Sequence, residues 1–274
     1  DICWNEYIYK SKGQYRQLFE WGEFKRKLGW NVLRVVLEEN GNIKNSAQIL
    51  YRKKLFLCYS WIPGGINGSL TDLNSEFLDL IKNSSNSLFI YTRADFIQLN
   101  NEKDDSFLKN SGWSKPDYVM NSGKFVILDL ANDNDHFLKN AKSKWRYHFK
   151  KSQKKGLQYS EEKKPEYFIE IEKELSELRD HRNVFTEREV KPMIDELRDK
   201  LIVFIAKDLN DNLLALRSVV LVGDTAWHLS SSVNTKGRDS LSGYGLLMHT
   251  IDICRQRGIK YYNLGGIYIE RFPG

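Results

Sequence analysis

The pattern of apolar and polar positions predicts a chain in which β-hairpins alternate with amphipathic helices. Two stretches, residues 32–54 and 201–223, each hold apolar runs on both sides of a short polar turn. The turn is Asn40-Gly41 in the first stretch and Asp211-Asn212 in the second. Such turns indicate β-hairpins, because Asn, Asp and Gly tolerate the positive φ angles that tight hairpin connections require.

The order of predicted elements is repeated in the two halves of the chain. Each hairpin follows a helical stretch and precedes further strand residues, a helix and a last strand, at 87–95 in the first half and 259–267 in the second. An internal repeat of this kind indicates a duplicated unit. The element order is that of an acyltransferase of the GNAT type. We therefore expect an α/β protein with two tandem GNAT-like (acyl-CoA N-acyltransferase-like) domains, residues 1–135 and 136–274, with mixed, largely antiparallel sheets.

The segment between the two halves, Lys139–Gly156, predicts a basic helix that ends at its glycine. It holds eight Lys or Arg residues and no acidic residue. An apolar stripe at helical spacing would bury one face: Leu138, Ala141, Trp145 and Phe149. Basic residues four apart would line a neighbouring face: Lys142, Arg146, Lys150 and Lys154. A solvated surface is one interpretation, but like charges at this spacing destabilise a helix, which favours an anionic ligand such as phosphate.

Composition and charge narrow the classes of partner. The chain has 274 residues, of which 41% are hydrophobic and 13% aromatic, enough for substantial cores. A net charge of +6 and a pI near 9.0 favour nucleic acid, nucleotide-linked substrates or anionic membrane surfaces. The cysteines, Cys3, Cys58 and Cys254, lack metal-binding spacing, so we expect reduced thiols in a cytoplasmic protein and no metal. No apolar run approaches the roughly 18 residues of a membrane span, and no secretory leader is recognisable.

Four stretches of the chain, in this order, resemble motifs of the FemABX family, the aminoacyl-tRNA-dependent transferases that add amino acids to peptidoglycan precursors. FEWGEFKRKLGW (Phe19–Trp30) is similar to the N-terminal helix of that family, and WIPGG (Trp61–Gly65) to its glycine-bearing loop. KSKWRYHFKKSQKKGL (142–157) is similar to its Arg-containing helix, and YNLGGI (Tyr262–Ile267) to its late Tyr-acid-Phe-Gly-Gly signature. The resemblance implies two GNAT-like domains and transfer of an amino acid from tRNA to an amine of a nucleotide- or lipid-linked peptidoglycan precursor.

The same resemblance implies that Lys25 and Arg146 hold the phosphates of the acceptor. The chemistry agrees, since a guanidinium binds phosphate in a bidentate manner and a lysine supplies a mobile charge. Lys150, one turn beyond Arg146, would extend this substrate-binding face. The alternative for Lys25 is a surface residue of an amphipathic helix. For Arg93 two alternatives stay open: it enters the cleft beside the acceptor, or it pairs structurally with a carboxylate such as Asp95.

The implied reaction needs no covalent nucleophile and no cofactor, because the ester of the aminoacyl-tRNA co-substrate is already activated. The protein must position two anionic substrates, relay a proton and stabilise an oxyanion. His228 and Tyr244 are candidates for proton transfer, although either could be a packed core residue. Asn263 stands where the family signature has an acid, and it either binds a substrate amide or bonds local backbone.

One segment favours another donor. In GRDSLSGYG, Arg238 followed by Gly243 and Gly245 resembles the pyrophosphate loop of coenzyme-A-dependent GNAT enzymes, where free N–H groups bind phosphate. A structural helix start explains the segment equally well. The alternative function is therefore an acyl-CoA-dependent N-acyltransferase that uses a coenzyme A thioester and acts on a sugar or amine in cell-envelope polysaccharide or natural-product synthesis.

A non-enzymatic RNA-binding module is a third candidate function, because aromatic residues interleave the basic helix. A lipid-linked acceptor would imply loose, peripheral attachment to the membrane. FemABX relatives also continue beyond a point equivalent to Gly274, into a segment with a basic residue that assists catalysis.

Overall fold

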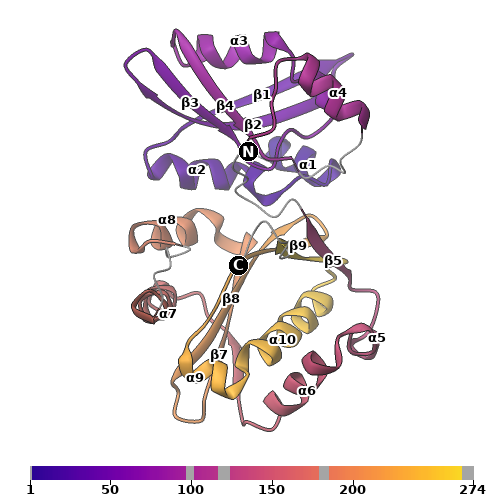
Figure 1. Cartoon of the computed structure of the whole chain (residues 1–274), viewed down its shortest axis with the longest axis vertical. Helices are drawn as coiled ribbons and strands as arrows, with labels where there is room; N and C mark the ends of the chain where they lie inside the picture. Colours follow the sequence, from indigo (N-terminus) through magenta and orange to yellow (C-terminus); the bar gives the residue numbers. More distant parts are fainter. Residues whose placement is uncertain (1, 97–101, 117–123, 179–184, 267–274) are drawn as a thin grey trace. The chain divides into compact units, whose positions relative to one another are not determined.

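The computed structural model describes residues 2–96, 102–116, 124–178 and 185–266 (Figure 1). These residues form two compact units, the first within residues 1–123 and the second within Lys124–Ile267. Each unit has its own β-sheet and its own hydrophobic core.

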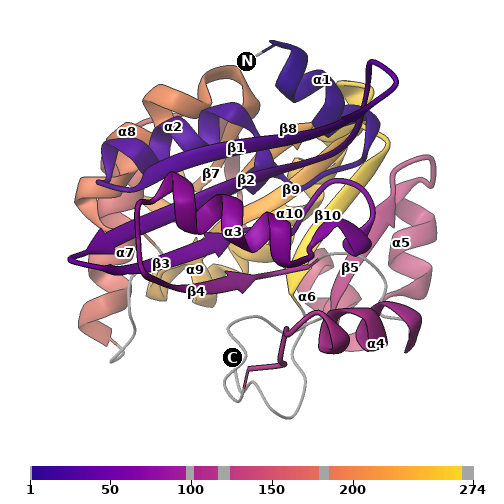
Figure 2. The ribbon, with the colours of Figure 1, turned by 90° about the horizontal axis from the view of Figure 1, so that it is seen from above.

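The first unit contains a four-stranded sheet in the order β1-β2-β3-β4 (Figure 2). Its strands are β1 (Asn31–Glu39), β2 (Asn42–Lys54), β3 (Leu57–Ile62) and β4 (Phe89–Ala94). Its helices are α1 (Ile2–Lys10), η1 (Tyr15–Gln17), α2 (Phe19–Lys27), η2 (Leu70–Asp72), α3 (Ser75–Ser84) and α4 (Glu102–Asn110). The first three strands form an antiparallel meander, and β4 pairs in parallel with β3. The expected hairpin is confirmed, with positive φ at Asn40 and Gly41.

Helices cover the two faces of this sheet unequally. Helix α2 lies against β1 and β2, where Leu50 and Phe24 are fully buried. Helix α3 packs on the opposite face, where Ile49, Ile62 and Ile81 form part of the core. Side chains on both faces of β2 are therefore buried where a helix covers them, such as Leu50 on the side of α2 and Ile49 on the opposite side. The parts of the sheet without a helix face solvent, as is common in antiparallel sheets.

The second unit contains a six-stranded sheet in the order β5-β10-β9-β8-β7-β6. Its strands are β5 (Phe125–Asp129), β6 (Gln158–Glu161), β7 (Leu201–Lys207), β8 (Leu213–Val222), β9 (Thr225–Val233) and β10 (Tyr261–Gly266). Its helices are α5 (Asn134–Asn140), α6 (Ser143–Ser152), α7 (Pro165–Leu178), α8 (Glu187–Leu197), η3 (Arg198–Lys200), α9 (Thr235–Ser240) and α10 (Ser242–Gln256).

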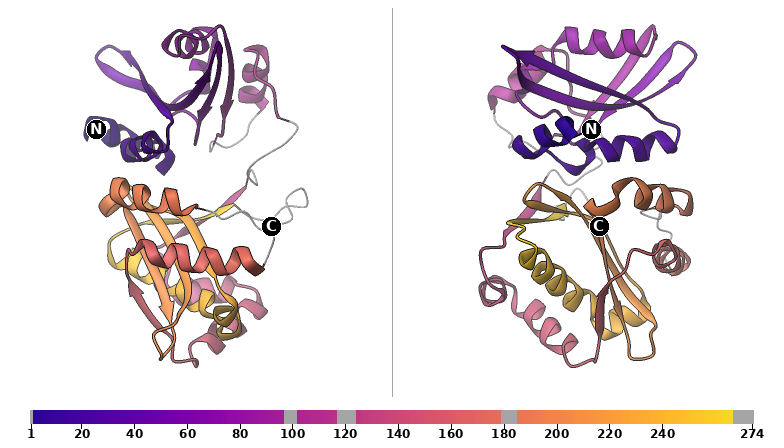
Figure 3. Two further views of the ribbon diagram at one scale, coloured as in Figure 1. Left: turned by 90° about the vertical axis from the view of Figure 1, so that its left-hand side faces the viewer. Right: turned by 180° about the vertical axis from the view of Figure 1, so that it is seen from behind.

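The second unit repeats the topology of the first. Strands β7, β8 and β9 form an antiparallel meander, α10 follows, and β10 pairs in parallel with β9. The duplicated α/β plan with mixed, largely antiparallel sheets is therefore confirmed. The two further views of Figure 3 show each sheet with its own helices.

The division between the units differs from the expected one, between residues 135 and 136. Strand β5 precedes that point but pairs with β10, with Leu128 opposite Tyr262, so it belongs to the sheet of the second unit. The alternating pattern of VILDL identifies a strand, but a strand pattern does not specify its partner.

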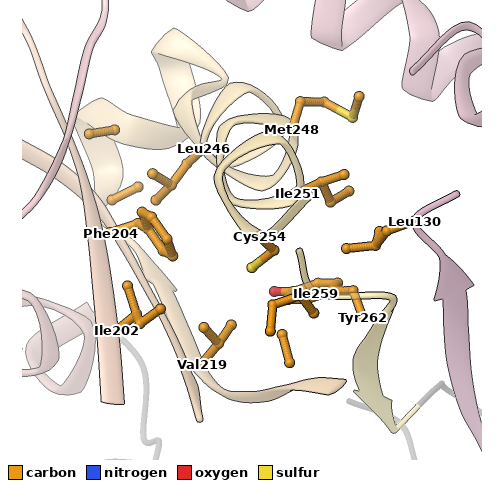
Figure 4. Packing of buried hydrophobic residues seen from close by; sticks show 13 residues of the cluster. Leu130, Ile202, Phe204, Val219, Leu246, Met248, Ile251, Cys254, Ile259 and Tyr262 are labelled. Carbon is orange, nitrogen blue, oxygen red and sulfur yellow. The ribbon is translucent and has the colours of Figure 1, made fainter. Parts of the chain in front are cut away.

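The core of the second unit lies between the sheet and α10 (Figure 4). Phe204, Cys254 and Tyr262 are fully buried there, and burial raises the pKa of the Cys254 thiol to about 12. Helix α7 packs on the other face of β8 and β9, where Ser232 donates a 2.6 Å hydrogen bond to Glu172. The central strands are consequently covered on both faces, which explains their nearly continuous apolar sequences.

The basic segment forms two helices instead of the single helix expected over Lys139–Gly156. Helix α5 ends at Asn140, and α6 runs only from Ser143 to Ser152. Ala141 and Lys142 between them are extended, with ψ near 150°. The expected apolar stripe is confirmed on α6, where Trp145 and Phe149 pack against the core.

Candidate functional site

The sheet of the second unit opens where β9 and β10 part. Their parallel pairing is limited to Tyr261–Asn263 on β10, which pair with Thr225–Trp227 on β9. His228 is the next residue on β9. The β8–β9 register also shifts after Ser218, opposite this point, and the β10–β5 register shifts after Asn263. Ladder irregularities of this kind re-aim side chains and leave backbone groups unpaired, as is common next to active sites.

Three side chains meet at this opening. Arg217 Nη1, from β8, donates to His228 Nδ1 and to the Tyr262 hydroxyl, each at 3.4 Å. A guanidinium can only donate, so Nδ1 of His228 accepts, and the proton of its neutral ring lies on Nε2.

The electrostatics of this cluster leave Arg217 as its only charge. Burial, with the adjacent Arg217 charge as the second cause, lowers the pKa of His228 to about 4. Burial also raises the pKa of Tyr262, which is fully buried. His228 and Tyr262 are therefore both neutral at pH 7.

Arg217 was not among the predicted site residues, although it is the only charged residue of the largely apolar strand LLALRSVVLV. No ion pair between side chains that the structure describes includes it. A partly buried guanidinium with neutral partners is poorly compensated, so it can bind an anionic group of a ligand.

The Asn263 side chain bonds the local backbone, the second of the two alternatives that the sequence left open. Its side chain is 2% exposed, and its Oδ1 accepts the N–H of Gly265 at 2.8 Å. Gly265 has a φ of +84°, and a Cβ there would lie 3.1 Å from Cδ2 of His228. Asn263 thus fixes a turn that brings the Gly265 backbone against the His228 ring.

Tyr244 lies in a different environment from His228. Its ring, on the first turn of α10, packs against Trp145 at 5.6 Å and His148 at 5.1 Å, both on α6. These contacts attach α10 to the basic helix, as the packing alternative in the sequence anticipated.

The expected pyrophosphate loop is mostly helical. Helices α9 and α10 are separated only by Leu241, with a φ of +61°, and Arg238 lies in α9 with Nη2 3.5 Å from the Thr235 hydroxyl. A Cβ on Gly245 would lie 1.9 Å from the Tyr159 hydroxyl oxygen, and one on Gly243 would lie 3.0 Å from Val233. Close packing therefore accounts for both glycines, and their phosphate role stays a prediction.

Arg146 has a structural use that the sequence pattern did not reveal. Its Nη1 donates to the carbonyl oxygens of Leu138 and Lys139, each at 3.3 Å, and to that of Ala141 at 2.5 Å. These carbonyls end α5, so the guanidinium stabilises the break before α6. Lys150 lies exposed one turn further along α6.

The two remaining predicted residues belong to the first unit. Lys25 Nζ, on α2, lies over the rings of Phe24 and Trp21, 4.5 and 5.1 Å from their centroids. Arg93 Nε lies 3.3 Å from Asp95 Oδ1, and Asp95 Oδ2 accepts a 2.7 Å bond from Trp61 Nε1. Of the two alternatives for Arg93, the structure has the pairing with Asp95.

The described residues contain no group of three or more His, Cys, Asp or Glu side chains arranged to hold a metal ion. Within the same residues, no helix has the length and apolar character to cross a bilayer.

Two meander-plus-crossover sheets in tandem, with parted strands in the second, define a tandem GNAT-like fold. No protein-family model and no curated protein matches the sequence. Among solved structures, FemX has the same fold, with a TM-score of 0.81 and 15% identity over 99% of this chain and 88% of FemX. L-PGS from Bacillus licheniformis matches with a TM-score of 0.60 and 13% identity, covering 100% of this chain and 78% of its own. A tandem GNAT protein from the clavulanic acid biosynthesis pathway matches with a TM-score of 0.53 and 9% identity, over 85% and 74% of the two chains. The fold suggested by the FemABX resemblance is thereby confirmed.

Proposed function

We propose that the protein is a FemABX-type aminoacyltransferase, which moves an amino acid from aminoacyl-tRNA to an amine of a nucleotide- or lipid-linked peptidoglycan precursor in the cytoplasm. The observation that carries this proposal is the FemX fold over 99% of the chain, together with the four ordered FemABX-like motifs in the sequence. L-PGS is a second structure with this fold over the whole chain, and we take its likeness as further support.

The reaction is a transfer from an ester to an amide. The acceptor amine attacks the ester carbonyl, a C–N bond forms, the C–O bond to the terminal ribose breaks, and the amine proton ends on the ribose oxygen. In this proposal Arg217 and the Nε2–H of His228 supply donors at the parting of β9 and β10. Such donors stabilise negative charge that develops on the carbonyl oxygen.

The acceptor would be held by its phosphates. We assign this role to Lys25, Arg146 and Lys150, as the resemblance implies. Arg146 can serve it only with the nitrogens other than Nη1, which already donates to the carbonyls that end α5.

A mass-spectrometric transfer assay tests the proposal. The protein is offered charged tRNA and, separately, acetyl-CoA, each with a nucleotide-linked and with a lipid-linked muropeptide acceptor. Product from charged tRNA alone is the expected result, and product from acetyl-CoA alone would overturn it.

The acyl-CoA-dependent alternative draws on the likeness to the tandem GNAT protein. Isothermal titration with coenzyme A separates the two. Binding that is abolished by Arg238→Ala would favour the alternative and its donor site at Arg238, Gly243 and Gly245. The packing of both glycines against Val233 and Tyr159 is the reason we place this function second.

A further inference from the structure

Apolar side chains gather on the surface of the first unit, at the turn between β2 and β3 and at the start of β4. We refer to the following residues as the apolar tip: Leu55, Phe56, Leu57, Leu88, Phe89 and Tyr91. Their exposed fractions run from 49% for Phe56 to 79% for Leu55. Large exposed apolar patches on a folded protein mark interaction surfaces.

The apolar tip is one continuous surface. Leu57 and Phe89 are partners in the parallel β3–β4 ladder. The rings of Phe56 and Phe89 lie 6.2 Å apart, and the Phe56 carbonyl accepts the N–H of Leu88 at 2.9 Å. Tyr91 stacks on the neighbouring Tyr59 at 5.9 Å. Backbone pairing therefore holds these side chains together in the folded protein.

The sheet explains why the apolar tip is uncovered by helices. On the face that carries Leu57, Phe89 and Tyr91, α2 covers β1 and β2 but not the outer ends of β3 and β4 (Figure 2). Helix α3 packs on the opposite face, around Ile81. Alternate residues of two strands consequently reach solvent with apolar side chains where a half-covered sheet normally exposes polar ones.

The two sequence stretches that carry the apolar tip are basic. No Asp or Glu occurs between residues 40 and 71 or between 80 and 94. Arg52, Lys53, Lys54 and Lys82 lie in these same stretches. Lys53 and Lys54 immediately precede the apolar turn and are exposed. A surface with apolar side chains in the middle and lysines at its border is complementary to anionic lipid.

We propose that the apolar tip and its neighbouring lysines form a docking surface for an anionic lipid membrane. Leu55, Leu57 and Leu88 would enter the boundary between headgroups and acyl chains, with Lys53 and Lys54 at the headgroups. Phe56, Phe89 and Tyr91 could also stack on nucleic-acid bases, but the three leucines offer neither a stacking ring nor a hydrogen bond to a base, which favours lipid. No membrane-spanning helix is required for such contact.

The docking surface also bears on the acceptor, and this part rests on the proposed function. An enzyme held at an anionic membrane meets lipid-linked precursors in two dimensions, whereas a nucleotide-linked precursor is dissolved. We therefore infer that the acceptor is lipid-linked.

Vesicle flotation of the whole chain tests the docking surface. The tip variant is Leu55→Asn/Phe56→Thr/Phe89→Thr. Asn tolerates the φ of +54° at position 55, and Thr suits the strand position of Phe89. The control is Leu209→Thr, which removes a side chain of similar exposure, 74%, from the second unit. Circular dichroism checks that each variant is folded.

The expected result is flotation of the wild type and of Leu209→Thr with phosphatidylglycerol-containing vesicles, about tenfold weaker flotation of the tip variant, and no flotation with phosphatidylcholine alone. Lys53→Gln/Lys54→Gln should weaken the phosphatidylglycerol-dependent part. Equal flotation of the tip variant would overturn the proposal. Equal flotation with phosphatidylglycerol and with phosphatidylcholine vesicles would also overturn it. Two further results would do the same: a wild type that does not float but forms a dimer that the tip variant has lost, or a wild type that binds an oligonucleotide and not vesicles.

Transfer assays separate this proposal from the proposed function. With lipid-linked acceptor in vesicles the tip variant should lose activity, while with a soluble nucleotide-linked acceptor any activity should be unchanged. Product from the soluble acceptor alone would overturn the lipid-linked inference. Absence of product from both acceptors in the wild type would count against the proposed function and leave the flotation result standing.

Discussion

Replacing Arg217 by Met tests the assignment of the opened sheet as the reactive part of the second unit. Met fills a similar volume without the charge, so it leaves the packing of β8 largely intact. The hydrogen bonds that are lost, to His228 and to Tyr262, are each 3.4 Å long and join a cation to neutral groups. No carboxylate that the structure describes would be left unpaired by the change.

The expected magnitudes differ for stability and for catalysis. Removal of a poorly compensated, partly buried charge should change the free energy of unfolding by less than about 1 kcal/mol, or increase it. Removal of a donor to a developing oxyanion should lower kcat/KM about 10²- to 10³-fold. The pKa of His228 should rise from its value near 4, because the Arg217 charge is the second cause of its depression.

Three measurements on the same variant check these expectations: urea unfolding, the transfer assay with charged tRNA, and an NMR titration of the histidine ring. A structural arginine would give the opposite pattern. Lower stability with unchanged kcat/KM would therefore refute the role of Arg217, whereas the matched variant Arg217→Lys should retain part of the activity because it keeps the positive charge.

Three further outcomes are expected. His228 has a folded-state pKa near 4, below its unfolded value near 6.5, so the unfolded state binds more protons between these pH values. In urea titrations the free energy of unfolding of the wild type should therefore fall by about 3 kcal/mol relative to that of His228→Gln as the pH falls from 7 to 4. An equal pH dependence of the two proteins would contradict this. Gly237→Ala places a Cβ 2.1 Å from the Leu214 carbonyl oxygen and should destabilise by about 1–3 kcal/mol in urea, with Lys236→Ala, on the same helix, nearly neutral. Arg146→Ala should abolish transfer and also lower the unfolding midpoint; an unchanged midpoint would remove its role at the end of α5.

The features that the sequence predicts well are those specified by neighbours along the chain. Turn residues with positive φ, as at Asn40-Gly41, and apolar alternation identify both hairpins and hence the duplication. The pairing of β5 is not specified in this way, because its partner strand, β10, lies far along the chain. Likewise, the break at Ala141 depends on one nitrogen of Arg146 reaching carbonyl oxygens five to eight residues earlier. Helical periodicity does not contain that information.

The candidate site was harder to predict for a related reason. Asn263 lies in the late motif and His228 was a candidate for proton transfer, and the structure places both at the opened sheet. Arg217 has no motif around it, and its significance depends on which side chains face it across β9 and β10. Two glycines show the opposite problem, a sequence pattern with a structural explanation. Gly243 and Gly245 match a phosphate-binding pattern, but close contacts with Val233 and Tyr159 explain why glycine stands at both positions.

One difference between the duplicated units indicates where a ligand can bind. In the first unit the parallel strands β3 and β4 pair without interruption from Leu57–Ile62 to Phe89–Ala94. In the second unit the equivalent strands, β9 and β10, pair only as far as Trp227 and Asn263. A closed ladder uses its backbone donors internally, whereas a parted one offers them to a ligand. The parted ladder of the second unit therefore has backbone groups to offer a ligand, whereas the closed ladder of the first unit does not.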